Sequence, residues 1–207
     1  MRAGIAIDEE NSTIMQSLKE LWKVKLHRSN LISAICLWSA NMFNFYLLMF
    51  YIKYFPGNVY QNTICCACSD IVAYILSGVV MKCLNTNRSL YICYMFSLSG
   101  GILYLTFEGN YEQLIPVFII LCRIGTNMAF SVTYCANVRL FPTKFLATCF
   151  GLENLVAHVL AIIGPVIAEL NEPIPFIAYL SSIAVGLTAT FFLRELEAEE
   201  KLKEKEQ

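Results

Sequence analysis

Charge is what this sequence has least of, since Asp, Glu, Lys and Arg make up only 15% of its 207 residues. A soluble domain carries roughly a quarter of its residues as charged side chains, which keep its surface in contact with water. Hydrophobic residues instead account for 57% of the chain, and its mean hydropathy is +0.56. A water-facing surface is therefore under-supplied, and the composition favours a membrane protein.

The motifs of common catalytic and metal sites are also missing from the sequence. It contains no Ser-His-Asp pattern, no His-Glu-x-x-His motif and no glycine-rich phosphate loop, so we expect no enzyme and no cofactor. Cys65-Cys66-Ala67-Cys68 has no matching Cys/His cluster elsewhere, which argues against zinc. We expect the nine cysteines to be small, reduced packing residues, and we expect no nucleic-acid partner.

Six apolar segments are long enough to cross a bilayer core, which takes about 20 residues in a helix. The segments between them carry the turn residues Gly, Pro and Asn. The first span contains no charged residue at all, unlike the polar-striped helices of a soluble bundle. The predicted spans are Leu31–Tyr51, Tyr60–Met81, Leu90–Phe107, Leu114–Asn137, Phe145–Ala168 and Phe176–Leu193.

Basic residues alternate strongly between the loops. The leader 1–30, the second and fourth loops and the tail together hold thirteen of the fifteen Lys and Arg residues. The opposite loops hold only Lys53, and Arg123 lies within a span. Since basic residues concentrate in cytoplasmic loops, both termini are predicted to be cytoplasmic.

Three regions follow from this pattern. Residues 1–30 form a cytoplasmic leader, 31–193 the six-helix transmembrane bundle, and 194–207 a charged cytoplasmic tail. Apolar residues recur at helical spacing in 12–28, which indicates an amphipathic helix on the inner membrane surface. A soluble linker helix is the alternative interpretation of this leader.

Four ionisable side chains fall deep within the predicted spans, where each costs several kcal/mol against lipid. At ~1.5 Å per residue, all four lie near the middle of the bilayer. A hydrated cavity is one interpretation, and ion pairs that only hold helices together, such as Asp70 with Arg123, are the other. Glu153 and His158 are about 140° apart around a helix, so they are not expected to face the same point. The four residues are Asp70, Arg123, Glu153 and His158.

Three stretches resemble a known family when taken in order. The motif "RIGTNMAFSVTY" followed by "RLFPT" and Gly151-Leu152 resembles the tenth helix, short inner loop and eleventh helix of organic cation/anion transporters of the major facilitator superfamily. The stretch 58–74, "NVYQNTICCACSDIVAY", is similar to their eighth helix, and 17–46 to the entry into their seventh. The resemblance therefore covers helices seven to twelve, the C-terminal half of such a transporter.

This resemblance implies a fold and a function. The fold is all-α, with six transmembrane helices forming one half of a major facilitator superfamily fold. The function is transport of small organic ions by alternating access, with cations favoured, in the plasma membrane. His158 stands where cation carriers have an acid and anion carriers an arginine. The resemblance implies substrate-binding roles for Tyr46, Asp70, Arg123 and His158, and the nearby rings of Phe45 and Trp38 are expected to add cation–π contacts.

The inner-gate motifs depart from the family pattern. Arg139 stands where the family has an acid before Leu-Phe-Pro-Thr, and Arg88 is what remains of a basic loop between helices eight and nine. We expect these two residues, together with Pro142 in the tight inner turn and Glu153, to have structural or gating roles. Gly100-Gly101, Gly125 and Gly164-Pro165 are expected at close helix contacts and a kink.

Six helices supply only half of a transporter cavity, so three interpretations stay open. The chain either joins an N-terminal six-helix half or partner subunit, or is a non-transporting structural subunit derived from such a transporter. The third is a different carrier or channel that forms a homodimer. In each case the lipid bilayer surrounds the bundle.

Overall fold

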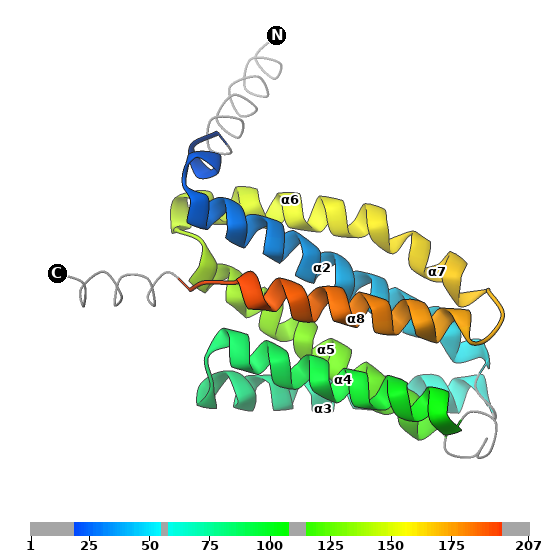
Figure 1. Ribbon diagram of the computed structural model, residues 1–207. Coiled ribbons are helices and arrows are strands. Elements are labelled where there is room, and N and C mark those ends of the chain that lie inside the picture. The colour runs from blue at the N-terminus through cyan, green and yellow to red at the C-terminus, as the bar shows by residue number, and fades with distance from the viewer. Residues whose placement is uncertain (1–18, 55–57, 108–114, 196–207) are drawn as a thin grey trace, which may run out of the picture.

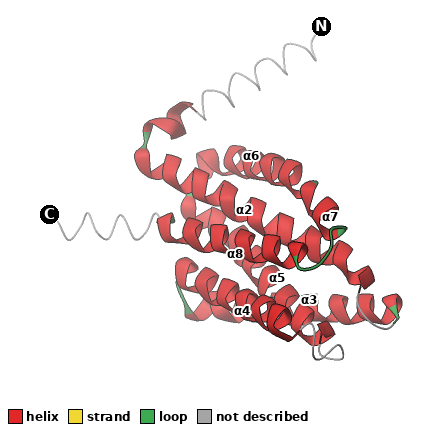
Figure 2. Cartoon of the chain, turned by 45° about the vertical axis from the view of Figure 1, so that its right-hand side comes forward, coloured by secondary structure: helices red, strands yellow, loops and turns green. Residues whose placement is uncertain are grey.

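The computed structural model describes residues 19–54, 58–107 and 115–195, and these ranges are helical throughout apart from short turns (Figure 2). Six helical segments within them are long and apolar enough to cross a membrane, so the predicted all-α membrane bundle is confirmed. The elements are α2 (Lys25–Tyr51), a 3-10 turn (Ile52–Tyr54), α3 (Val59–Cys83), α4 (Thr86–Phe107), α5 (Ile115–Leu140), α6 (Thr143–Ala161), α7 (Ile163–Ala168) and α8 (Ile174–Phe192).

The predicted kink at Gly164-Pro165 separates α6 from α7. Helix α6 ends at Ala161, four residues before Pro165, and a proline clashes with the carbonyl group four residues earlier. Gly164 lies against the backbone of α2, where an added Cβ would be 3.2 Å from the carbonyl oxygen of Phe43. The sixth and seventh helices therefore act as one bent span, Thr143–Ala168.

In chain order, the first three spans and the last three spans form two triplets, and the first helix of each triplet packs against the other triplet. Helix α2, the first of one triplet, packs on α6 and α8 of the other, and α5 packs on α3 and α4 in return. Figure 1 shows α2 beside α6 and α8, and α5 beside α3 and α4. Each half of the major facilitator fold is built from two three-helix repeats, and this chain has that half-fold.

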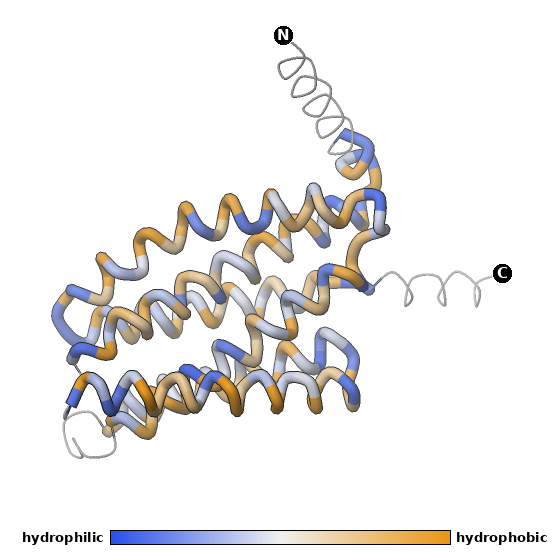
Figure 3. The backbone as a smooth tube through the Cα atoms, turned by 180° about the vertical axis from the view of Figure 1, so that it is seen from behind, coloured by the Kyte–Doolittle hydropathy of each residue, from blue (hydrophilic) through white to orange (hydrophobic). Residues whose placement is uncertain are grey.

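The described parts of the four basic segments meet at one end of the bundle. Asn30, in the first turns of α2, donates to the carbonyl oxygens of Leu140 at 3.4 Å and Arg194 at 2.8 Å. Lys144, after the turn between α5 and α6, forms an ion pair with Glu20 and holds the pKa of that carboxyl below its usual range. These contacts bring the described ends of the leader, the fourth loop and the tail together, and Figure 3 shows hydrophilic residues at both ends of the helices.

The opposite end is held by a smaller contact. Lys53 pairs with Glu169, and the hydroxyl group of Tyr54 donates to the same carboxylate at 2.9 Å. These two partners hold the pKa of Glu169 below its usual range. The contact joins the end of α2 to the end of α7, although its exposed groups contribute little to stability.

The predicted amphipathic segment, 12–28, is described only from residue 19 onward. Residues 19–23 are helical, the chain bends at Val24, and residues 25–28 belong to α2. Leu21 is buried in the core, whereas Trp22 is exposed. Whether this leader lies on the membrane stays a prediction.

Candidate functional site: a charge pair and an aromatic cluster

Asp70 of α3 and Arg123 of α5 form a two-point ion pair inside the bundle. The guanidinium group donates from Nε to Oδ1 and from Nη2 to Oδ2, each at 2.8 Å. Asn127, one turn after Arg123, donates to the same carboxylate. Both charges are therefore compensated locally, as the ion-pair interpretation of the sequence described.

The two members of this pair differ in exposure. The Asp70 side chain is 22% exposed and that of Arg123 is 9% exposed, so the acid is the more accessible partner. The guanidinium carbon lies 5.5 Å from the ring centre of Phe45, within the range of a cation–π contact. Nη1 is buried and has no hydrogen-bond partner among the described residues.

Six aromatic rings from three helices continue outward from this pair, and we call them the aromatic cluster. Phe45 packs on Tyr46 at 5.5 Å and on Phe130 at 6.5 Å between ring centres. Trp38 contacts Phe130 at 5.0 Å, Phe150 at 5.4 Å and Tyr134 at 6.1 Å. The cluster consists of Trp38, Phe45 and Tyr46 of α2, Phe130 and Tyr134 of α5, and Phe150 of α6.

The predicted binding residues are not equally accessible. Phe45 and Tyr46 are half-buried, whereas Trp38 is 1% exposed and packs against Met42, Ala157 and Phe150 in a second core. Trp38 therefore packs beneath the more exposed rings of the cluster and is not itself accessible to a ligand. The structure brings Phe45, Tyr46 and Trp38 together with the charge pair.

Glu153 and His158 point in different directions from α6. Glu153 is completely buried, and Asn137 of α5 donates to its Oε2 at 2.7 Å. His158 is exposed, and its Nδ1 lies 2.8 Å from the backbone oxygen of Asn154 on the same helix. The structure does not bring His158 to Asp70.

The predicted gating residues Arg88, Arg139 and Pro142 lie at the end of the bundle that carries Asn30 and Lys144. Arg139 is 3.4 Å from the Thr86 hydroxyl and 3.9 Å from Glu195, which also accepts from the Thr86 backbone at 3.0 Å. These contacts connect α5, α4 and the segment after α8. Pro142 precedes α6, and Arg88 is exposed.

Sequence reasoning missed several residues of the site because each is uncharged. Asn127, Phe130, Tyr134 and Asn137 all lie on α5, three or four residues apart and starting four residues after Arg123. This spacing follows one side of a helix, and it could have identified them. Glu195 is the charged exception: in the sequence it stands only as part of the charged tail, and its contact with Arg139 appears in the folded chain.

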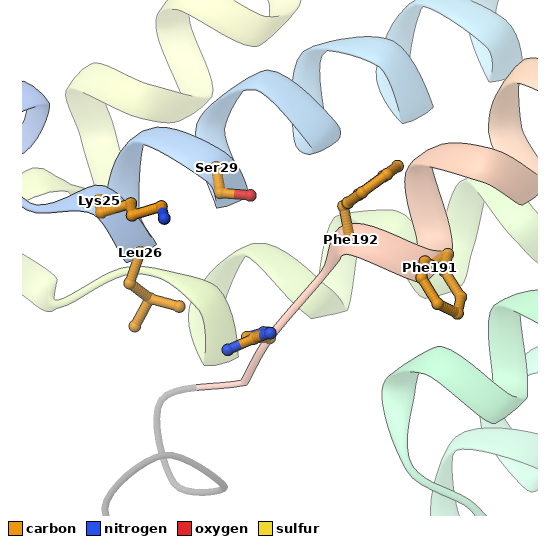
Figure 4. A pocket seen from close by; sticks show the side chains of 6 residues that line it. Lys25, Leu26, Ser29, Phe191 and Phe192 are labelled. Atoms are coloured by element: carbon orange, nitrogen blue, oxygen red, sulfur yellow. The ribbon is translucent and has the colours of Figure 1, made fainter.

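Neither a metal site nor a disulfide is present in the part of the chain that the structure describes. No group of His, Cys, Asp or Glu there could hold a metal ion, and all nine cysteines are free. A cavity of about 390 Å³ lies between the start of α2 and the end of α8 (Figure 4). Lys25, Leu26, Ser29, Phe191, Phe192 and Arg194 line it, so it is separate from the charge pair.

The bundle and its buried charge pair define a multi-pass integral membrane protein. No protein-family profile matches the chain. It is 23% identical over 196 residues to solute carrier family 22 member 4 of Mus musculus, and the match covers 91% of this chain and 35% of the relative. It is 26% identical over 200 residues to organic anion transporter 3 of Rattus norvegicus (94% and 37%). It is 23% identical over 192 residues to organic cation/carnitine transporter 4 of Arabidopsis thaliana (90% and 36%).

These relatives are organic cation and anion transporters, so the resemblance found in the sequence is confirmed. The chain spans a little over a third of the length of each of these three relatives.

Proposed function

We propose that this chain is the C-terminal six-helix half of an organic-ion transporter. The proposal is supported by the similarity, which extends over nine-tenths of the chain, and by the two helix triplets, each of which packs its first helix against the other. In transporters of this fold the substrate binds between two halves that rock around a central site. A second six-helix half therefore completes the site, and transport follows alternating access.

A small organic cation is the substrate class that this half fits best, and the ring faces beside an accessible acid carry this conclusion. Asp70 is more exposed than Arg123, and Phe45 and Tyr46 lie on the same side of the pair. Each favourable contact between a cation and a ring contributes ~0.5–2 kcal/mol. The substrate competes with Arg123 for the carboxylate.

His158 has a separate part in this proposal. It is exposed on α6, away from the charge pair, so it reaches a substrate only within the space enclosed by the second half. Its role is therefore tested independently of Asp70.

The inner gate belongs to the same proposal. The contacts of Arg139 with Thr86 and Glu195 join helix ends within this half. We place this end at the cytosol, because it carries the basic segments, and we place the transporter in the plasma membrane. Closure of the gate then brings the inner ends of the two halves together.

Uptake measurements test the substrate class. The chain is expressed with an N-terminal six-helix half, and uptake of tetraethylammonium is compared with uptake of benzoate, normalised to membrane protein. We expect tetraethylammonium uptake that falls at least tenfold in Asp70→Asn and in Tyr46→Leu. Glu169→Gln is the matched control, because it changes an exposed acid that directly follows α7, and we expect it to keep full uptake. Unchanged cation uptake in both Asp70→Asn and Tyr46→Leu contradicts the proposal.

A non-transporting structural subunit is the second candidate. It is favoured by the Arg139–Glu195 contact, which uses gate charges inside this half rather than between halves. Purification of the tagged chain from its own membranes separates the two functions. A stable complex that contains no transporter half, together with no uptake of either probe, supports the subunit.

A further inference from the structure

Glu153 is a buried acid without a cation. Its side chain is 0% exposed, and the ion pairs formed by the described residues do not include it. Asn137 donates from Nδ2 to Oε2 at 2.7 Å, while Oε1 has no partner among those residues. An ionised carboxylate held by a single hydrogen bond in such a place is strongly unfavourable.

Two further buried groups beside this carboxyl lack partners within the described part of the chain. They are Oδ1 of Asn137, which can only accept, and Nε1 of Trp38, which can only donate. Asn137 already binds the carboxyl through its other atom, and the indole of Trp38 lies beside the same group. Glu153 therefore lies beside one unpartnered acceptor, Oδ1 of Asn137 on α5, and one unpartnered donor, Nε1 of Trp38 on α2.

These two groups match the two protonation states of Glu153. With a proton on Oε1, the acid donates to Oδ1 of Asn137 while Nδ2 still donates to Oε2, which is a two-point pairing of an acid with an amide. Without that proton, Oε1 is an acceptor, and the N–H of Trp38 is the available donor. Each state satisfies one group that is otherwise unpartnered.

Among the described residues, no cation pairs with Glu153. The thiol of Cys149 lies one turn earlier on α6, and Tyr134 of α5 packs on Trp38 and Phe150. Arg123 of α5 is committed to Asp70, and His158 is exposed on another side of α6. A proton is the cation that remains to neutralise Glu153.

A cavity lies beside Asn137, which is one of its lining residues. This cavity of about 290 Å³ is also lined by Tyr134 and Phe150, and it extends to Thr143 at the start of α6. A proton that leaves Oε1 passes to water in this cavity, and the O–H bond forms again on the same oxygen when a proton returns. No other reactant takes part.

We propose that Glu153 and Asn137 form a proton-binding site, with Trp38 as the alternative partner of the deprotonated acid. Loss of the proton draws the indole of Trp38 toward Oε1, and Trp38 belongs to the aromatic cluster. Proton binding therefore adjusts the wall that faces the substrate. The site itself stands apart from the proposed function, whereas its coupling to uptake rests on it.

Infrared difference spectroscopy of the purified chain in lipid tests the proton. We expect a C=O stretching band of a buried carboxylic acid at mildly acidic pH, which is lost at mildly alkaline pH. Glu153→Gln, which keeps the shape and an acceptor for Asn137, lacks one carboxyl group's share of this band. Glu169→Gln keeps the full band, because Glu169 is exposed. A titrating band that is the same in wild type and Glu153→Gln overturns the proposal, and so does the absence of a band.

Tryptophan fluorescence provides a second readout that does not depend on the infrared band. Trp22 and Trp38 are the two tryptophans of the chain, so Trp22→Phe leaves Trp38 as the sole fluorophore. Its emission is expected to change with pH in the same range as the band and to become insensitive in Trp22→Phe/Glu153→Gln. Emission that titrates equally in both proteins rejects Trp38 as the alternative partner.

Uptake at two pH values separates this site from the proposed function. Tetraethylammonium uptake that depends on pH in wild type and is independent of pH in Glu153→Gln supports the coupling. A Glu153 band that titrates while neither protein takes up the probe leaves the proton site established and removes the proposed function. Uptake whose pH dependence survives Glu153→Gln overturns the coupling.

Discussion

At the residue scale, the geometry of Asp70 and Arg123 explains why charges are tolerated between apolar helices. Two parallel N–H···O bonds and a third from Asn127 replace the hydration that both groups lose. The attraction of the pair is offset by this desolvation, so its net stabilisation is small. Removal of one partner alone destabilises the fold much more, because it leaves the other charge buried without a counter-charge.

Asp70→Asn is therefore expected to destabilise the bundle more than the loss of both charges. We expect a cost of about 2–4 kcal/mol, below the range for a fully buried pair because the Asp70 side chain is 22% exposed. Asp70→Asn/Arg123→Gln should recover at least half of that loss. Unfolding of the detergent-solubilised chain by heat or denaturant measures both variants. Single and double variants of equal stability would show that the two charges are not coupled.

The sequence identifies charged site residues more easily than their uncharged partners. Depth along a span was enough to single out Asp70 and Arg123, because a charge in hydrocarbon needs an explanation. Asn127 and Asn137 carry no such cost signal, and amides occur in many helices. Which way Trp38 and His158 point depends on the rotation of α2 and α6, and packing against neighbouring helices sets that rotation.

At the element scale, α4 and α5 are the most closely packed pair because glycine allows their backbones to approach. A Cβ on Gly125 would lie 2.4 Å from the backbone nitrogen of Ser97 on α4. A second close point is Gly100, where an added Cβ would be 2.8 Å from the backbone nitrogen of Cys122. In membranes, such small residues replace the hydrophobic effect as the basis of helix association.

Gly125→Ala is expected to destabilise the bundle by about 1–3 kcal/mol, because the added methyl group meets backbone atoms that cannot turn aside. Gly151→Ala is the matched control. It lies within α6, where nothing among the described residues is within 4 Å of an added Cβ. We expect that variant to be as stable as wild type or more stable, since alanine favours helix. Thermal unfolding of the two variants side by side decides this, and equal losses would contradict the packing explanation.

The spans were predictable as elements because hydrophobic length is a strong signal, whereas their ends were not. The sequence placed the first span at Leu31–Tyr51, but α2 begins at Lys25. The difference is explained by Asn30, which lies in the helix and bonds to the ends of two other helices. A polar residue of that kind marks a loop in a hydropathy pattern and a helix junction in the folded chain.

At the scale of the whole molecule, much of the apolar surface of this half is uncovered. In the most apolar 18-residue stretch of α3, only 22% of the residues are buried within the chain, and the same share is buried in the α6–α7 span. In the first span the share is 61%. Apolar surface of this extent does not persist in water. Lipid covers such a surface, and the second half that we propose would cover part of it.

The fold brings the basic segments to one end, and the positive-inside rule predicts which side of the membrane that end faces. An epitope inserted between Gly109 and Asn110, in the loop between the third and fourth spans, should be reached by antibody from outside sealed cells. The same epitope added after Gln207 should be reached only after permeabilisation, because residues 194–207 carry four of the thirteen basic residues of the inner end. Reversal of these sites would place the basic end outside, against a bias of thirteen to one. It would also open the predicted gate at Arg139 and Glu195 to the wrong side of the membrane. The assignment of an inner gate would then be wrong, while the helical bundle itself would be unaffected.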